Sequence, residues 1–203
     1  MANDIPAAPA KGGRGALVVI AGSALLAIVG PVTGNLLMTD TPAHESGRTV
    51  AVTVAPATNT ITIQHISGPQ YLRAYLDIVK VATACDGLTG ADIKIGKTFT
   101  ETQCALMLES RLAETAEKVM ACTPGLALSI PGRDYVRFAA VSLAYNVGWP
   151  TYCRSTMRAQ INAGQIAASC TSLTWFNRAG GRVVPGLVTR RAREKAVCLK
   201  DAA

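Results

Sequence analysis

Residues 15–39 are 25 consecutive residues without an ionisable side chain, bounded by Arg14 and Asp40. As a helix rising 1.5 Å per residue, this run is long enough to cross a hydrocarbon core of ~30 Å. Glycine, proline, serine, threonine and asparagine interrupt its apolar stretches, so we expect a membrane helix that is held weakly. Lys11 and Arg14 precede the run, and the positive-inside rule therefore predicts a cytoplasmic N-terminus with residues 40–203 exported.

Two alternatives to a membrane anchor remain open. One is a cleaved secretory signal with a small-residue site at residues 41–43, and the other is a buried helix of a cytosolic protein. We favour an uncleaved signal anchor because the run exceeds the roughly 7–15 apolar residues of a signal peptide. The predicted organisation is a cytoplasmic N-terminus (1–14), an anchor (15–39), a β-prone linker (40–66) and a folded domain (67–203).

The charge of the chain is concentrated near its C-terminus. Residues 1–145 carry 11 basic and 11 acidic side chains, whereas residues 146–203 carry 9 basic and 2 acidic ones. A basic face of this kind suggests a polyanionic partner, which could be nucleic acid, anionic lipid or an acidic cell-wall polymer.

Six cysteines follow the uncharged run, and their spacing does not suit zinc, so we expect no metal site. Disulfides formed in an oxidising compartment are the simplest explanation. Of the 15 possible pairings we weakly favour Cys170 with Cys198, because both lie in a predicted helical region. The six are Cys85, Cys104, Cys122, Cys153, Cys170 and Cys198.

The local pattern predicts strands first and helices later. Alternating and β-branched residues at 48–54 and 58–63 predict two short strands, forming either a hairpin or an extended tether. Residues 78–83 and 93–95 predict a small antiparallel sheet.

A capping box at residues 100–103 predicts a long helix that ends before Pro124. Helical spacing predicts four further helices, at 134–146, 156–162, 165–175 and 187–199. A small sheet followed by a helical lobe makes an α+β domain.

Several short motifs follow one another in a fixed order after residue 66: Ala-Tyr-Leu-Asp at 74–77, Thr83, Cys-Asp-Gly-Leu-Thr-Gly at 85–90, Ala-Tyr-Asn-Val-Gly at 144–148 and Gly-Leu-Val-Thr-Arg-Arg at 186–191. In this order, behind a glycine-rich uncharged segment, they resemble the phage-type lysozymes. That glycoside hydrolase family includes the T-even phage lysozyme and the signal-arrest-release endolysins. The resemblance covers about residues 66–199. It implies a lysozyme-like α+β fold, with a small antiparallel sheet and a mainly helical lobe, here preceded by the N-terminal membrane helix.

The resemblance also implies an activity, which is hydrolysis of the β-1,4 bond between N-acetylmuramic acid and N-acetylglucosamine in peptidoglycan, leading to host cell lysis. No cofactor is expected, and the partners would be peptidoglycan and, through residues 15–39, the membrane. The protein would be held in the host inner membrane and then released to the periplasm as a monomer. Export and the lack of a recognition motif argue against nucleic acid.

Members of the family use a Glu and an Asp nine positions apart, with a Thr six positions after the Asp. Asp77 and Thr83 match the second and third of these residues. The position nine before Asp77 is Gly68, or Ser67 if one residue is inserted, and neither is an acid. Losing a general acid costs about 10²–10⁴-fold in rate.

Three explanations for the missing acid remain open. Asp86, on the turn after Thr83, or Glu45, on the predicted linker, could replace it. Alternatively, the fold binds murein without cutting it, as a wall-binding or virion-associated protein. In the third explanation a reduced activity uses Asp77 alone.

The resemblance further implies that Asn146 and Arg190 line or brace the glycan groove. Asn146 could instead simply end its helix, and Arg190 could face solvent or an internal carboxylate.

Overall fold

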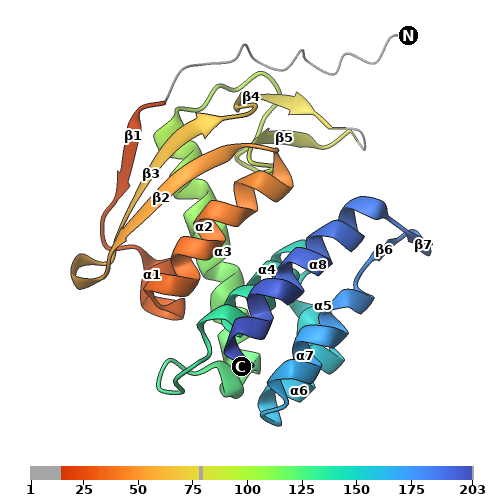
Figure 1. Cartoon of the computed structure of the whole chain (residues 1–203). Helices are drawn as coiled ribbons and strands as arrows, with labels where there is room; N and C mark the ends of the chain where they lie inside the picture. The colour runs from red at the N-terminus through yellow and green to blue at the C-terminus, as the bar shows by residue number, and fades with distance from the viewer. Residues whose placement is uncertain (1–14, 78–79, 203) are drawn as a thin grey trace. The chain divides into compact units, whose positions relative to one another are not determined.

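The computed structural model describes residues 15–77 and 80–202 (Figure 1). Within these residues the chain divides into two compact units. The first contains residues 15–23 and 38–110, and the second contains residues 24–37 and 111–202.

The first unit contains a three-stranded antiparallel sheet in the order β1-β3-β2 (Figure 1). Its strands are β1 (Leu17–Ile20), β2 (Thr49–Ala55) and β3 (Thr60–Ser67). Alternate β3 side chains, including Ile61 and Ile63, are buried on one face. The two strands predicted around the start of this unit are confirmed and form a hairpin, while β1 comes from the predicted membrane segment.

A second, two-stranded sheet in the same unit pairs β4 (Tyr71–Leu76) with β5 (Ala82–Cys85). The other edge of β4 is bordered by residues 96–99, since the Ala74 amide donates to the Lys97 carbonyl oxygen at 2.8 Å.

The predicted strand at 93–95 is wrong. Residues 93–95 lie in successive turns between Gly90 and Gly96, which both have positive φ, so the chain bends where an extended strand was expected. The start of the predicted 78–83 strand, residues 78–79, lies outside the described residues, and β5 begins at Ala82.

Two helices begin in one unit and end in the other, α2 (Pro31–Glu45) and α3 (Glu101–Cys122). The start of α3 carries the predicted capping box. The Gln103 amide donates to Thr100 Oγ1 at 3.1 Å, and the Thr100 amide donates to Gln103 Oε1 at 2.8 Å.

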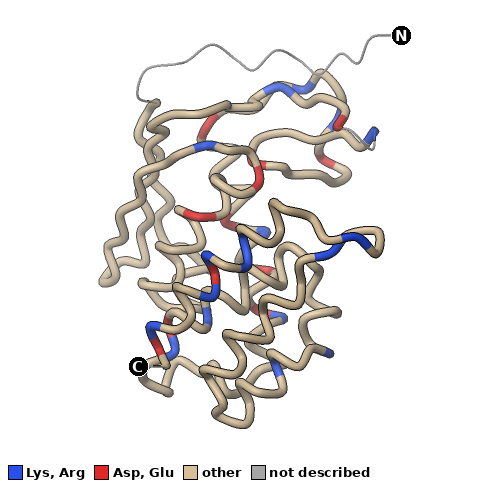
Figure 2. The backbone as a smooth tube through the Cα atoms, turned by 45° about the vertical axis from the view of Figure 1, so that its right-hand side comes forward, with Lys and Arg blue, Asp and Glu red and all other residues tan. Residues whose placement is uncertain are grey.

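The second unit is helical (Figure 1). The four helices predicted after residue 133 are confirmed, with small shifts at their ends. Its further elements are α1 (Ala24–Val29), α4 (Asp134–Val147), α5 (Trp149–Cys153), α6 (Thr156–Asn162), α7 (Ile166–Ser172), α8 (Pro185–Cys198), and the short hairpin β6 (Arg178–Ala179) with β7 (Arg182–Val183). Figure 2 shows that basic residues of this unit have few acidic neighbours in the chain, as the sequence predicts.

Three disulfides staple the units internally. Cys85–Cys104 joins β5 to α3 in the first unit, while Cys122–Cys153 and Cys170–Cys198 lie in the second. The weakly favoured pairing of Cys170 with Cys198 is therefore confirmed.

The expected N-terminal membrane helix is absent from the described residues. Residues 15–39 are divided among β1, α1 and the start of α2, and no described helix has both the length and the apolar character that a membrane span requires. The division has a local cause, since Gly22 and Gly30 adopt φ of +63° and +82° and interrupt the helix.

Candidate active site

Asp77 and Thr83, the two residues that match the family pattern, lie together in the first unit. Asp77 directly follows β4, and Thr83 lies on β5 opposite Tyr75. The Val81 amide donates to Asp77 Oδ1 at 2.8 Å, and Thr83 Oγ1 lies 3.4 Å from Asp77 Oδ2. Thr83 Oγ1 also lies 3.1 Å from the Val81 carbonyl oxygen, which is the shorter of its two contacts.

Two tyrosines precede Asp77 on β4. The rings of Tyr71 and Tyr75 are tilted against each other, with centroids 5.1 Å apart. Burial, and then the neighbouring Tyr71 and Asp77, raise the pKa of the Tyr75 phenol. Tyr75 therefore stays protonated at neutral pH and can act as a hydrogen-bond donor beside the Asp77 carboxylate.

Glu45 is the last residue of α2, and it lies against the turn that follows β5. A methyl group on Gly87 would be 3.3 Å from Glu45 Cβ and 3.7 Å from Glu45 Oε2. Gly87 has φ of +74°, and it lies four residues after Thr83 on the same stretch of chain. The fold thus brings the end of α2 to the segment that carries Thr83, a proximity that counting positions along the chain does not reveal.

The position that the family spacing predicts for the acid, Gly68, has a different role. A Cβ atom on Gly68 would lie 2.5 Å from the carbonyl oxygen of Gly47, and its φ is +90°. The β2–β3 hairpin therefore leaves the chain beside Gly47 and returns to the same place at Gly68. Residues 48–67 form a loop-out between Glu45 and Asp77.

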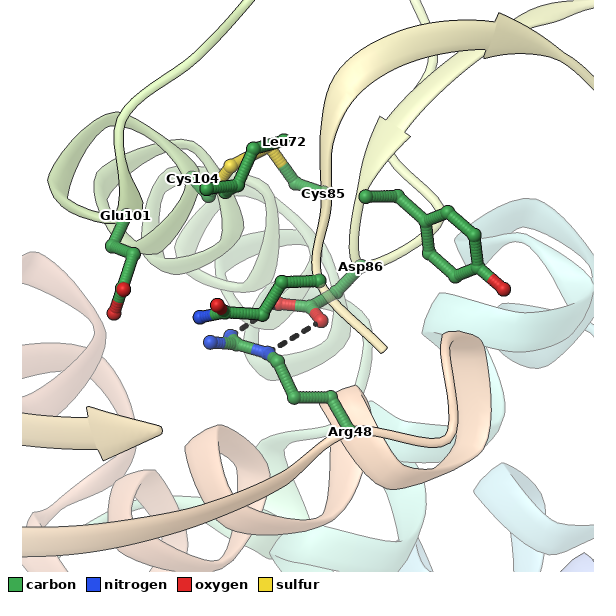
Figure 3. A pocket seen from close by; sticks show the side chains of 8 residues that line it. Arg48, Leu72, Cys85, Asp86, Glu101 and Cys104 are labelled. Carbon is green, nitrogen blue, oxygen red and sulfur yellow. Dashed lines mark hydrogen bonds and ion pairs between the residues drawn. A yellow bond between two sulfur atoms is a disulfide. The ribbon is translucent and has the colours of Figure 1, made fainter. Parts of the chain in front are cut away.

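Asp86 is buried, with 2% of its surface exposed, and its carboxylate is fully engaged (Figure 3). Arg48 donates from Nε to Oδ1 at 2.9 Å and from Nη2 to Oδ2 at 2.5 Å. Ser46 Oγ donates to Oδ1 at 2.8 Å. The adjacent Cys85–Cys104 disulfide fixes the backbone that carries Asp86. Both oxygens of Asp86 are thus occupied by donors from the segment after Glu45.

Asn146 and Arg190 both lie in the second unit. Asn146 is exposed in the last turn of α4. Arg190 is buried on α8, where Nε donates to Glu194 Oε1 at 3.1 Å. Glu194 also accepts from Ser142 Oγ at 2.6 Å. Arg190 therefore contacts an internal carboxylate, one of the two positions considered for it from the sequence.

Among the described residues, no group of three His, Cys, Asp or Glu side chains is arranged to hold a metal ion.

Known proteins match this chain in sequence and in structure. The profile of the phage lysozyme family matches residues 68–194. The chain belongs to the phage lysozyme family. A SAR-endolysin of Enterobacteria phage P21 is 40% identical over 134 residues, covering 66% of this chain and 78% of the relative. A SAR-endolysin of Bacteriophage PS119 is 36% identical over 154 residues, covering 76% and 89% respectively.

A solved structure also resembles this phage lysozyme. The endolysin from Escherichia coli O157:H7 phage FAHEc1 aligns with a TM-score of 0.56 at 25% identity, covering 64% of this chain and 84% of that one. The profile match begins at Gly68, where the hairpin rejoins the chain. Asp77, Thr83 and Asp86 are inside the match, whereas Glu45 precedes it.

Proposed function

We propose that this phage lysozyme is an endolysin that hydrolyses the β-1,4 bonds of peptidoglycan, with Glu45 as its general acid and Asp77 as its second carboxylate. The observation that carries this proposal is the placement of Glu45 against the turn after β5, the strand that holds Thr83. Lysozyme-type glycoside hydrolysis needs two carboxyl groups with different roles, and these residues supply them.

The chemistry divides between the two carboxyl groups. The Glu45 carboxyl donates a proton to the glycosidic oxygen, so that the bond from this oxygen to the anomeric carbon breaks with a neutral leaving group. Asp77 Oδ2 and Thr83 Oγ1 accept hydrogen bonds from a water molecule. That water attacks the anomeric carbon, and Asp77 takes up its proton.

Thr83 suits a role as an acceptor. A hydroxyl group has one proton, and the nearer acceptor for that proton is the Val81 carbonyl oxygen at 3.1 Å. The lone pairs of Thr83 Oγ1 are then available to the proposed water beside Asp77.

The β2–β3 hairpin accounts for the unusual spacing of the two acids. Glu45 precedes Asp77 by 32 positions, whereas the family spacing is nine. The looped-out residues 48–67 supply 20 of the 23 extra positions, and the contact of Gly47 with Gly68 closes the loop-out at its base. The acid that is missing near Gly68 is thus Glu45, displaced in sequence by an insertion.

Neither competing explanation fits as well. Asp86 is a weaker choice for the acid because it is buried and bound through both oxygens. A fold that binds murein without cutting it was suggested only by the missing acid, and Glu45 removes that reason.

The product identifies the bond that is cut. Purified full-length protein is incubated with sacculi, and the new reducing ends are reduced with borohydride and assigned by mass spectrometry. We expect reducing ends at N-acetylmuramic acid. Reducing ends at N-acetylglucosamine, or intact glycan strands, would contradict the proposal.

We also propose that residues 15–39 occupy the inner membrane before this fold forms. Their lack of charge over 25 residues supports insertion, and their polar and glycine residues make exit from the bilayer less costly. Because the start of α2 belongs to this run and Glu45 ends the same helix, the acid reaches its site only after release.

Pulse-labelled full-length protein in cells tests this order of events. It should first resist carbonate extraction from the membrane and later become periplasmic. Protein that is extractable from the earliest time point would contradict insertion.

A further inference from the structure

We infer that the buried ion pair between Arg48 and Asp86 is the brace that positions Glu45 for proton transfer. This inference rests on the proposed role of Glu45 as the general acid. Arg48 and Asp86 are positioning residues, since they act through Glu45.

The brace has good geometry and little exposure to solvent. Arg48 is 7% exposed and Asp86 is 2% exposed. The guanidinium contacts both carboxylate oxygens in a two-pronged arrangement (Figure 3), which fixes orientation as well as distance. Ser46 Oγ adds a third hydrogen bond to the same carboxylate.

The brace surrounds Glu45 in the chain and in space. Ser46 and Arg48, one and three positions after Glu45, both bind Asp86. The next residue after Asp86 is Gly87, which lies directly against the Glu45 side chain. Movement of Asp86 would therefore release both the end of α2 and the turn that supports the acid.

The loop-out explains why a brace is needed. With a spacing of nine, a short connection would itself limit how far the acid can move from Asp77. Here a 20-residue loop-out separates them, and a long connection leaves more conformational freedom to be removed by contacts. Asp86 is three residues after Thr83 on the same stretch of chain, so binding Arg48 to Asp86 ties α2 to the strand that holds the rest of the site.

The test compares two leaving groups. Sacculi have a sugar leaving group that needs protonation, whereas a 2,4-dinitrophenyl glycoside of a murein oligosaccharide has a leaving group that does not. A variant that misplaces Glu45 should lose rate on sacculi and much less on the dinitrophenyl glycoside. A variant that merely destabilises the fold lowers both rates equally.

The full-length variants are Arg48→Met and Asp86→Asn, with Glu45→Gln as the benchmark. Since a misplacement of about 1 Å can cost 10²-fold, we expect kcat on sacculi to fall ~10–100-fold, with KM little changed. The loss on the dinitrophenyl glycoside should be at least roughly ten times smaller. Ser46→Ala removes one hydrogen bond to Asp86 and should show the same split, more weakly.

The control is Ser23→Ala, which removes a 2.7 Å hydrogen bond to buried Glu109 in the same unit but away from the brace. It should lower both rates by the same factor.

The outcomes separate the two proposals. If Glu45→Gln shows the split but the Arg48, Asp86 and Ser46 variants do not, the brace is wrong and the role of Glu45 stands. If Glu45→Gln itself shows no split, the proposed function is wrong. If Arg48→Met and Asp86→Asn do not fold, the ratio of the two rates in Ser46→Ala decides.

Discussion

Gly47 and Gly68 lie against each other although a 20-residue loop-out separates them, and a Cβ atom on Gly68 would lie only 2.5 Å from the Gly47 carbonyl oxygen. This contact is the point at which the β2–β3 hairpin joins the rest of the chain. It allows an inserted hairpin to sit between two acids without separating the elements that carry them.

Substitution of Gly68 by alanine should open this junction. Gly22→Ala is a matched control, because Gly22 also has positive φ, +63°, but nothing lies within 4 Å of its Cβ position. Both variants incur the cost of a left-handed conformation, roughly 1–2 kcal/mol. Gly68→Ala should cost roughly 1–3 kcal/mol more because its methyl group meets backbone. Urea unfolding measures both, and equal losses would contradict a tight junction.

Gly87→Ala should impair activity more than stability. Its methyl group would press on Glu45 Cβ at 3.3 Å, so the acid must shift by a few tenths of an ångström. Gly96→Ala is the control, since Gly96 has a similar φ of +79° and only Arg73 Nη2 nearby, at 3.8 Å. We expect kcat on sacculi to fall roughly 10-fold further in Gly87→Ala. Similar rates in the two variants would show that Glu45 does not depend on this turn.

Much of the fold follows from local patterns in the sequence. The capping box at Thr100 and Gln103 places the start of α3, and β-branched alternation places β2 and β3. Chemistry at Asp77 and Thr83 is expected from their spacing, and the structure places the two side chains 3.4 Å apart.

Other features could not be predicted because they depend on tertiary contacts. An uncharged run such as 15–39 has the same composition whether it spans a bilayer or enters a protein core, so β1 and α1 were not expected. Counting positions back from Asp77 assumes an unbroken connection, which the hairpin violates. The Arg48–Asp86 pair is 38 residues apart and carries no sequence signal.

Removal of the Cys85–Cys104 disulfide should affect stability and activity together. The bond closes a separation of 19 residues, and the chain-entropy account assigns it about 3 kcal/mol. Because Cys85 directly precedes Asp86, a variant with both cysteines changed to serine should also lose activity at temperatures where it remains folded. The same change at Cys122 and Cys153 should lower stability but retain activity. Equal activity losses would mean that the first disulfide has no special relation to the site.

Tyr152 should make the protein sensitive to alkaline pH. Burial raises the pKa of its phenol well above the ordinary value, even though it lies 3.1 Å from Thr123 Oγ1. A raised pKa in the folded state contributes stability that is complete below about pH 10, the pKa in the unfolded chain, and is lost as pH rises further. The loss should approach ~1.4 kcal/mol per pH unit above pH 10.

Urea unfolding at pH 9 and pH 11 measures this dependence. Tyr152→Phe should be less stable at pH 9 by about 1 kcal/mol, for the lost hydrogen bond, but should show a shallower decline. An unchanged slope would exclude Tyr152 as the cause.

The role of Glu45 is tested most directly by the rate at which Glu45→Gln releases reducing ends from purified sacculi. The control is Glu114→Gln, an acid on α3 whose side chain is 66% exposed and whose nearest charged contact is a 3.9 Å ion pair. Glu45→Gln should retain its melting temperature and lose ~10²–10⁴-fold in rate, while Glu114→Gln stays within about twofold of wild type. A Glu45→Gln enzyme that cuts sacculi within a few-fold of the wild-type rate would contradict the assignment.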